Sequence, residues 1–252
     1  PSYPSVAMTL QPTVTSERKT SFPTITPSLT PLPIISPTLL VPPETPLPTL
    51  PQDVALSLVS DLLKNKSGCN LPCWWGITPG KTSWQTAYNF LTPFAVRYTY
   101  INLSTEQTSF VVGFLFSASE DLKSNVFQNY SINYGTVELI EILFSRVPTS
   151  DLPSFLNENG PPGEVWIRTF GTEYKGTIPF YLILFYPDQG VLALYDSNDA
   201  KLRGDKVQKC FDQDTVYELA LWPPEREYSF KAAIHQTEGF RFDDGFPLLP
   251  LE

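Results

Sequence analysis

Residues 69–91 read CNLPCWWGITPGKTSWQTAYNFL, and they join a tight turn to the start of a helix. The glycines of the segment 76–80 permit a positive φ and therefore favour a turn. Apolar side chains then recur at helical spacing, at Trp84, Ala87, Tyr88 and Leu91. Thr82 or Ser83 precedes this run and can cap the helix. The sequence therefore predicts an amphipathic helix that starts near residue 84.

Two cysteines open this stretch, Cys69 and Cys73, in a Cys-x₃-Cys arrangement. Zinc sites use Cys-x₂-Cys with a second pair or with histidines, and thioredoxin-like sites use Cys-x-x-Cys at a helix start. Neither pattern is present, so we expect no metal here. A structural disulfide between Cys69 and Cys73 is the simplest state, and pairing of either with Cys210 is the alternative.

Adjacent tryptophans follow the second cysteine. In an extended chain the side chains of Trp74 and Trp75 point to opposite sides. One interpretation is that one ring fills the core while the other lies half exposed. The alternative makes the exposed ring, together with Trp84 or Tyr88, a platform for a sugar ring or for a proline of another subunit.

Strand-like segments follow the helix and then recur after a second, shorter helix at 150–162. The first set is 95–103, 109–117, 125–132 and 136–144, and the second set is 164–170, 178–186, 190–196 and 215–222. The segment 110–116 matches 180–186 at an offset of 70, and 136–144 matches 215–222 at an offset of 79. These patterns predict an α+β fold, a tandem repeat of a helix followed by a four-stranded antiparallel meander.

Four regions follow from this interpretation. They are an extended arm or stalk (1–52), a leading helix with the first repeat (53–148), the second repeat (149–223) and a C-terminal extension (224–252). Asp53 is the expected N-cap of the leading helix, which Gly68 should end. Ser150 is the expected cap of the shorter helix that opens the second repeat.

The arm, residues 1–52, is rich in proline and threonine, with 13 of the 26 prolines and four charged side chains. Proline fixes φ and removes an amide donor, so neither a helix nor a central strand is expected. A spacer between a cell-envelope anchor and the domain is one interpretation. The other is an arm that docks on a neighbouring subunit by strand addition, through Ile34, Ile35, Leu39, Leu40 and Val41.

Composition excludes several function classes. The net charge of −9 and the lack of a Lys/Arg cluster argue against nucleic acid. The sequence contains no run of 18 apolar residues, which is the length that a helix needs to span a bilayer. The chain starts at Pro1 without a signal peptide, so we expect a processed form. Three cysteines are too few to build the fold from disulfides.

No arrangement typical of an active site stands out. His235 is the lone histidine, and no G-x-S-x-G nucleophile motif occurs. The acidic pairs 225/227 and 243/244 are close in sequence, which does not establish two carboxylates across a cleft. The segment 196–206 has oxygen ligands for Ca²⁺ but lacks the EF-hand pattern. We therefore expect a protein that is not an enzyme and has no cofactor and no metal.

Three segments carry a resemblance to known proteins: residues 69–91, YPDQGVLALY (186–195) and ELALWPP (218–224). They resemble an uncharacterised family of bacterial cell-surface proteins that are often lipid-anchored. GITPGKTSW (76–84) and NGPPGEVW (159–166) also resemble the tandem modules of β-lactamase-inhibitor-protein-like lipoproteins. The resemblance implies an extracellular location and a role in binding or assembly.

Two functions follow as hypotheses. The first is a non-enzymatic cell-surface assembly protein whose arm docks on copies of itself or on other envelope proteins, with sheet edges as docking rows. The second is a stalked binding module that recognises a glycan or peptide through exposed aromatics. Trp74, Trp75 and Trp84 are the expected partner-binding residues of the domain.

Overall fold

The structure is a computed structural model. It describes residues 49–102, 108–120, 123–169, 177–203, 206–209, 214–235 and 248–250. The arm residues Ile34, Ile35, Leu39, Leu40 and Val41 lie outside these ranges, as does Cys210. The predictions that concern them are therefore not addressed by the structure.

The secondary structure follows the predicted order of helices and strands. The α-helices are α1 (Gln52–Asn65), α2 (Trp84–Leu91), α3 (Leu152–Asn159) and α4 (Phe230–His235). Short 3₁₀ turns are η1 (Lys66–Gly68), η2 (Thr92–Phe94) and η3 (Pro187–Gln189). The strands are β1 (Arg97–Asn102), β2 (Ser109–Ser117), β3 (Asn125–Asn133), β4 (Thr136–Ser145), β5 (Glu164–Thr169), β6 (Thr177–Tyr186), β7 (Val191–Arg203), β8 (Lys206–Gln208), β9 (Val216–Leu221) and β10 (Leu248–Pro250). Strand β7 extends well past its predicted end, and β8, β10 and α4 have no counterpart in the prediction.

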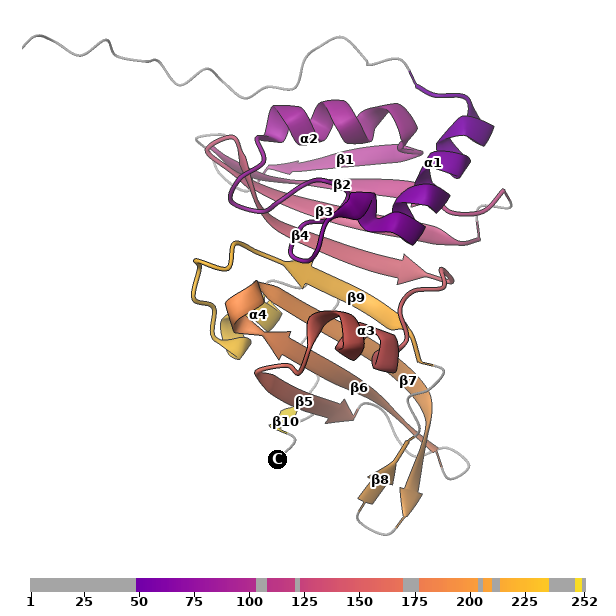
Figure 1. Ribbon diagram of the computed structural model, residues 1–252, viewed down its shortest axis with the longest axis vertical. Coiled ribbons are helices and arrows are strands. Elements are labelled where there is room, and N and C mark those ends of the chain that lie inside the picture. Colours follow the sequence, from indigo (N-terminus) through magenta and orange to yellow (C-terminus); the bar gives the residue numbers. More distant parts are fainter. Residues whose placement is uncertain are drawn as a thin grey trace, which may run out of the picture. The chain divides into compact units, whose positions relative to one another are not determined.

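The strands form one antiparallel sheet, shown in Figure 1. Its order is β1-β2-β3-β4-β9-β7-β6-β5-β10, and β8 pairs with β7 beside this path. Strands β4 and β9 meet in the middle, where Ile140 pairs with Leu221. An α+β fold dominated by antiparallel sheet is thereby confirmed. We call α1, α2 and β1–β4 the N-terminal half, and α3, β5–β7 and β9 the C-terminal half.

Tight turns with a positive φ connect neighbouring strands. Tyr134 and Gly135 have φ values of 46° and 77° between β3 and β4. Two successive residues with positive φ are typical of a type I′ hairpin turn, whose twist matches that of the strands. Gly190, with φ 66°, closes the connection from β6 to β7. These turns make short connections possible between sequential antiparallel strands.

Both predicted ends of the leading helix differ from those in the structure. Helix α1 starts at Gln52 after Pro51, without a side-chain cap, so the N-cap role for Asp53 is wrong. It ends at Asn65 rather than at Gly68, because Lys66 already has left-handed backbone angles. Gly68 instead closes the short turn η1.

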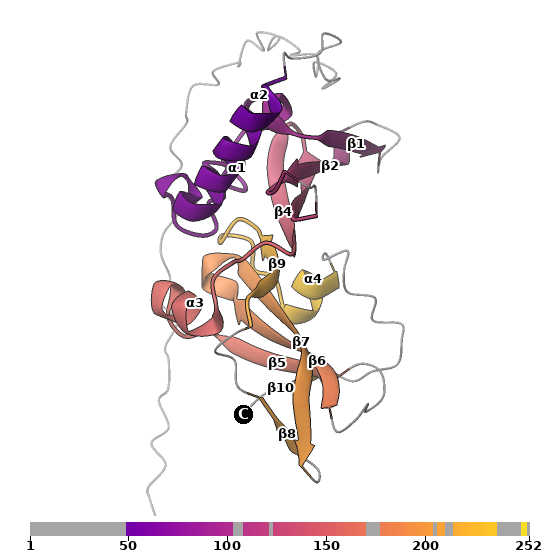
Figure 2. The same ribbon diagram turned by 90° about the vertical axis from the view of Figure 1, so that its right-hand side faces the viewer.

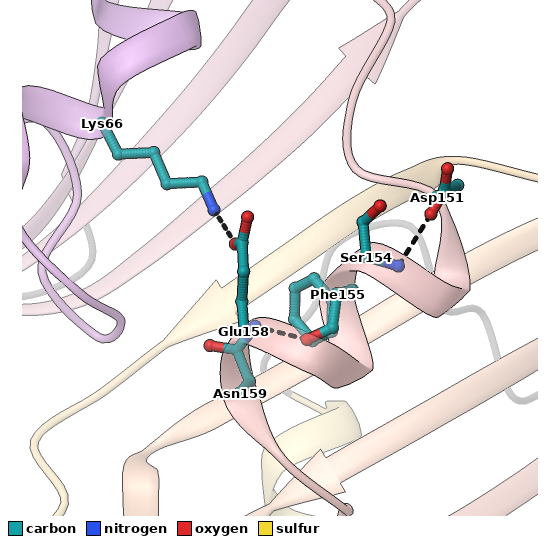
Figure 3. A network of polar contacts seen from close by, with 6 residues as sticks. All are labelled: Lys66, Asp151, Ser154, Phe155, Glu158 and Asn159. Carbon is teal, nitrogen blue, oxygen red and sulfur yellow. Dashed lines mark hydrogen bonds and ion pairs between the residues drawn. The ribbon is translucent and has the colours of Figure 1, made fainter.

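The two short helices α2 and α3 are capped by side chains. Ser83 caps α2 by accepting a hydrogen bond from the amide of Thr86, as predicted. Helix α3 is capped by Asp151 and not by Ser150. The Asp151 carboxylate accepts from the amide of Ser154 at 2.7 Å, as Figure 3 shows. The predicted cap is therefore displaced by one residue, to another of the preferred capping residues.

The main core lies on the sheet face that α1, α2 and α3 cover. Alternate residues of each strand point to this face. Side chains from both halves form one cluster that includes Trp75, Trp84, Phe114, Phe155 and Tyr195. In Figure 2, α1 and α3 lie on one side of the sheet and α4 lies on the other.

A second, smaller core lies on the opposite face of the C-terminal half. There α4 packs Phe230 on Trp166, with ring centroids 4.3 Å apart and nearly parallel planes. This cluster also contains Phe185 of β6 and Trp222, which directly follows β9. The sheet of the C-terminal half is thus covered by a helix on each face.

Candidate binding cleft between helices α1 and α3

The adjacent tryptophans sit in a tight hairpin and are not part of an extended chain. Trp74 and Ile77 exchange two backbone hydrogen bonds of 2.9 Å, and Trp75 and Gly76 have φ values of 53° and 80°. This is a type I′ geometry, which breaks the alternation of side chains that an extended chain would have. Both rings therefore enter the core, stacked with centroids 5.7 Å apart.

The three tryptophans predicted to bind a partner are buried. Trp74 is 3% exposed, Trp75 is 2% exposed and Trp84 is 3% exposed. The prediction that one ring of the Trp74–Trp75 pair is half exposed is wrong. Trp84 packs among aromatic rings of α2, β1 and β2, including Tyr88 and Phe110. None of the three offers a free ring face on which a partner could stack.

Cys69 and Cys73 form a disulfide, with Cα atoms 5.7 Å apart. Between them Asn70 accepts a hydrogen bond from the Cys73 amide at 2.9 Å, so the loop is also closed by its backbone. The predicted pair is therefore present in the structure. Its loop follows η1 and leads into the Trp74 hairpin, which fixes the chain where it leaves α1.

A wide polar cleft lies between this loop and the end of α3, with a volume of about 570 Å³. Its walls come from the end of α1, the disulfide loop, α3 and the turn η3. Four of its lining residues carry a side-chain amide: Asn65, Asn70, Asn159 and Gln189. Its charged side chains are Lys64, Lys66 and Glu158. The cleft is therefore rich in neutral hydrogen-bonding groups and carries a small excess of positive charge.

An ion pair joins the two walls of the cleft. Figure 3 shows Lys66, at the end of α1, pointing toward Glu158 of α3, with which it forms an ion pair. The two side chains are 28% and 49% exposed. Pairs this open to solvent contribute about 0–1 kcal/mol to stability. A ligand can therefore replace this contact at little cost.

The wall formed by α3 is held by hydrogen bonds to its last turn. Asn159 donates through its amide to the carbonyl of Phe155 at 2.9 Å (Figure 3). Gln189 donates to the carbonyl of Asn159 at 3.1 Å. Tyr186 donates to the carbonyl of Gly160 at 3.0 Å, and burial raises the pKa of Tyr186 to about 12. The helix end that faces the cleft is thus anchored to the β6–β7 connection.

A small cavity of about 40 Å³ shares two lining residues, Lys66 and Leu71, with the cleft. Its other lining residues come from both halves. Seven are apolar, Leu63, Trp74, Phe144, Pro148, Phe155, Val216 and Leu219, and two carry hydroxyls, Thr149 and Ser150. A water molecule needs about 10–15 Å³. This cavity, which we call the floor cavity, therefore has room for a group of a few heavy atoms.

Trp74, one of the residues that line the floor cavity, has an unsatisfied hydrogen-bond donor. Its side chain is 97% buried, and its indole Nε1 has no hydrogen-bond acceptor among the described residues. A buried donor without a partner costs about 1–3 kcal/mol. An acceptor on a bound ligand would remove this cost.

The backbone of the cleft wall adopts conformations that non-glycine residues rarely use. Lys66 has φ 47° and Ser67 has φ 53°, both left-handed. Left-handed residues other than glycine cost on the order of 1 kcal/mol each and cluster at functional sites. Here they turn the chain from α1 into the disulfide loop and place Lys66 opposite Glu158.

Sequence reasoning did not identify the residues that line the cleft. Asn65, Asn159 and Gln189 each lie at or beside the end of a helix or turn, close to a glycine. Such positions signal a turn but carry no indication of a binding role. Their convergence depends on the pairing of β4 with β9, which the sequence does not specify.

The other candidate catalytic or metal-binding residues from the sequence form no further site among the described residues. Within the described ranges no group of three or more His, Cys, Asp or Glu side chains could hold a metal ion. The side chain of His235 and the pair 243/244 lie outside the described residues. No helix in these ranges is long and apolar enough to cross a membrane.

Comparison with protein-family models, with curated proteins and with solved structures found no match to this chain. The resemblance to bacterial cell-surface proteins therefore remains a prediction from the sequence.

Proposed function

We propose that this protein is a non-catalytic binding module that holds an extended peptide in the cleft between α1 and α3. The observation that carries the proposal is the combination of an amide-lined cleft with an apolar floor. Ligand sites typically join apolar walls to a few polar groups that fix orientation. Here the polar groups line the wide part, and the apolar groups lie at the floor cavity.

Side-chain amides suit a peptide backbone because each offers both a donor and an acceptor. The four amide-bearing residues come from both walls, so an extended chain between them could be bonded on two sides. Asn159 and Gln189 each already donate one hydrogen bond to a backbone carbonyl, so a peptide would meet their remaining amide hydrogen and carbonyl oxygen. One small apolar side chain of the peptide would occupy the floor cavity. A peptide carbonyl near Trp74 would supply the acceptor that its indole N–H lacks among the described residues.

A glycan is the competing ligand, and the lining of the cleft disfavours it. Among the described residues no aromatic side chain lines the wide part, so they offer a sugar ring no flat face on which to stack. Aromatic rings line only the floor cavity, where about 40 Å³ is too little room for such a ring. We therefore favour a peptide over a glycan.

The described residues that line the cleft do not include the groups for acid–base catalysis. Its lining has one carboxylate, Glu158, which is already paired with Lys66. Hydrolysis of glycosides uses two carboxylates, and nucleophilic catalysis uses a nucleophile beside a base. The lining residues contain neither arrangement, which supports binding rather than turnover.

We also propose that the two halves are tandem copies of one helix–meander unit. In the N-terminal half the cap residue Ser83 forms a β-bridge with Thr136, just at the start of β4. In the C-terminal half the cap residue Asp151 forms a β-bridge with Thr215, just before β9. These threonines are the pair that the sequence offset of 79 aligns. The cleft would then lie between two related units.

Export from the cytoplasm fits this role. Structural disulfides form and persist in oxidising compartments. The pair Cys69–Cys73 supports an extracellular or cell-surface location, in line with the family resemblance.

Selection from a displayed peptide library against the intact chain tests the proposal. We expect enrichment of peptides that share one small apolar residue flanked by polar ones. The synthesised peptide is then titrated calorimetrically into the wild type and into Leu63→Phe, which fills the floor cavity. Affinity should fall at least about tenfold in this variant, a loss of about 1.4 kcal/mol.

Leu58→Phe is the matched control. It makes the same change on α1 at a half-buried position that lines neither the cleft nor the floor cavity. We expect it to bind the peptide as the wild type does. Equal affinity of Leu63→Phe and the wild type, or failure to enrich any peptide, would overturn the proposal. If the wild type binds a glycan on an array and Leu63→Phe abolishes that binding, the ligand of the cleft is a glycan and not a peptide.

A further inference from the structure

Strand β1 leaves an open edge in the described sheet. Its six residues pair with β2 in an unbroken register, and no other described strand pairs with it. Natural edge strands are usually protected by lysines, prolines, bulges or short length. Strand β1 reads RYTYIN, with a single charge and no proline, whereas β10 at the other end has three residues and includes Pro250. The β1 edge is therefore suited to accept another strand.

The aromatic core reaches this edge without being fully covered. Tyr98 is 41% exposed and Tyr100 is 36% exposed. Their inner sides contact Tyr88 and Trp84 of α2, with ring centroids 6.0 Å and 6.5 Å apart. A strand added beside β1 would place its own side chains next to these two rings and extend the core by one layer.

An apolar groove of about 280 Å³ lies where β1 begins. It lies between the start of α1 and the segment that precedes β1, and Leu50, Leu56, Phe94 and Val96 line it. Val96 is 53% exposed and directly precedes β1. The groove therefore continues into the open edge and gives a docked segment an apolar anchor beside its hydrogen-bonding row.

The described chain starts at this groove. Thr49 lines it, and 48 residues precede Thr49. Between residues 23 and 48 the longest run without proline is 38–41, Thr-Leu-Leu-Val. This run can donate amide hydrogens to an edge strand, and its Leu39 and Val41 would fall on the same face.

The number of residues between the run 38–41 and the groove favours the run of a second copy, rather than that of the same chain, as the strand that pairs with β1. Seven residues, 42–48, separate Val41 from Thr49, and four of them are proline. Proline-rich spacers extend by about 3.1 Å per residue, which gives about 22 Å here. Strand β1 spans about 20 Å at 3.3 Å per residue. A chain that ran back along its own β1 would thus place prolines against the edge, and residues 38–41 would lie beyond it.

We propose that residues 38–41 of a second copy of this chain add to β1 as a strand and anchor their apolar side chains at the groove formed by Leu50, Phe94 and Val96. This goes beyond peptide binding in the cleft and uses a different surface. The donor segment and the acceptor edge are different parts of the chain, so the contact is head-to-tail. Such contacts build open assemblies unless rotation closes a ring.

Sedimentation velocity of full-length variants tests this inference. The donor variant Leu39→Asp/Val41→Asp should be monomeric, and so should the acceptor variant Val96→Lys/Thr99→Lys, whose new charges lie at exposed positions. The wild type should form species larger than a dimer that grow with concentration. A one-to-one mixture of the two variants should form a dimer and nothing larger, because one variant retains an intact donor and the other an intact acceptor.

Matched controls separate docking from general effects of charge. Leu29→Asp/Leu32→Asp makes the same change elsewhere in the arm, and Val54→Lys adds a lysine at an exposed position of α1 outside the groove. Both should assemble as the wild type does, and circular dichroism should show that every variant is folded. A monomeric wild type would overturn the inference, and so would a donor or acceptor variant that assembles as the wild type does. A mixture that remains monomeric would also overturn it.

Discussion

In the N-terminal half of the sheet both helices, α1 and α2, pack on the same face, whereas the C-terminal half has α3 on that face and α4 on the opposite one. The strand order within the two halves is nonetheless similar, and they meet through β4 and β9. The comparison shows that one antiparallel arrangement tolerates two ways of covering its apolar faces. The additional helix α1 and its disulfide loop form the cleft wall that faces α3.

The largest effect is expected from truncating a tryptophan in either core. Trp75→Ala removes a ring from the shared core, and Trp222→Ala removes one from the core beneath α4. Each should lower the free energy of unfolding by about 3–5 kcal/mol. Because β4 and β9 pair, we expect a single calorimetric transition that shifts in both variants. Two separate transitions, each sensitive to one variant, would show that the halves fold independently.

A glycine in each half gives the next comparison. At Gly190 an added Cβ would lie 2.1 Å from the carbonyl oxygen of Trp222, and φ is 66°. At Gly76 φ is 80°, but no atom lies within 4 Å of the added Cβ. Gly190→Ala should therefore cost on the order of 4 kcal/mol because backbone must move. Gly76→Ala should cost about 1–2 kcal/mol from the left-handed conformation alone. Urea unfolding measures both, and equal losses would contradict the contact at Gly190.

Loss of the disulfide should have a moderate effect that is confined to the N-terminal half. The ring spans Cys69 to Cys73, and the loop-entropy relation gives about 2 kcal/mol for so short a loop. Cys69→Ser/Cys73→Ser should lower stability by this amount. Hydrogen exchange should rise first around residues 66–77 and leave β5–β7 unchanged. Unchanged exchange in the disulfide loop would contradict its role in holding the cleft wall.

The smallest effect concerns the caps of α2 and α3. Hydrogen bonds from Ser154 lower the pKa of Asp151 below its ordinary value, while Ser83 at the matching position does not titrate. A lowered pKa in the folded state stabilises the protein above the unfolded pKa, and this contribution is lost as pH falls through the folded value. Asp151→Ser should therefore flatten the decline of stability with acid below about pH 4. Urea midpoints across this range measure the change, and an unaltered acid slope would contradict it.

Much of the fold could be predicted because its signals are local. The i, i+3, i+4, i+7 spacing from Trp84 to Leu91 predicts α2 with its observed bounds. Alternation along 109–117 and 136–144 places β2 and β4 within a residue. The cap of α3 is displaced by one residue, since Ser150 and Asp151 are both good capping residues and the sequence does not rank them.

The site could not be predicted because its signals are non-local. The burial of both Trp74 and Trp75 depends on a left-handed φ at a tryptophan, which propensity does not favour. The cleft depends on α1 and α3 being brought together when β4 pairs with β9. The polar residues at helix ends acquire their shared role through that pairing alone.

The most direct test of the proposed cleft follows the indole N–H groups during titration with a selected peptide. The chain has five tryptophans, so a ¹⁵N–¹H spectrum should show five indole signals, and Trp74→Phe assigns that of Trp74. We predict that the Trp74 signal shifts as the peptide saturates the cleft. The signal of Trp166, whose Nε1 donates to Glu164 at 2.8 Å on another part of the sheet, should stay in place. A peptide that binds while the Trp74 signal does not move would contradict the account.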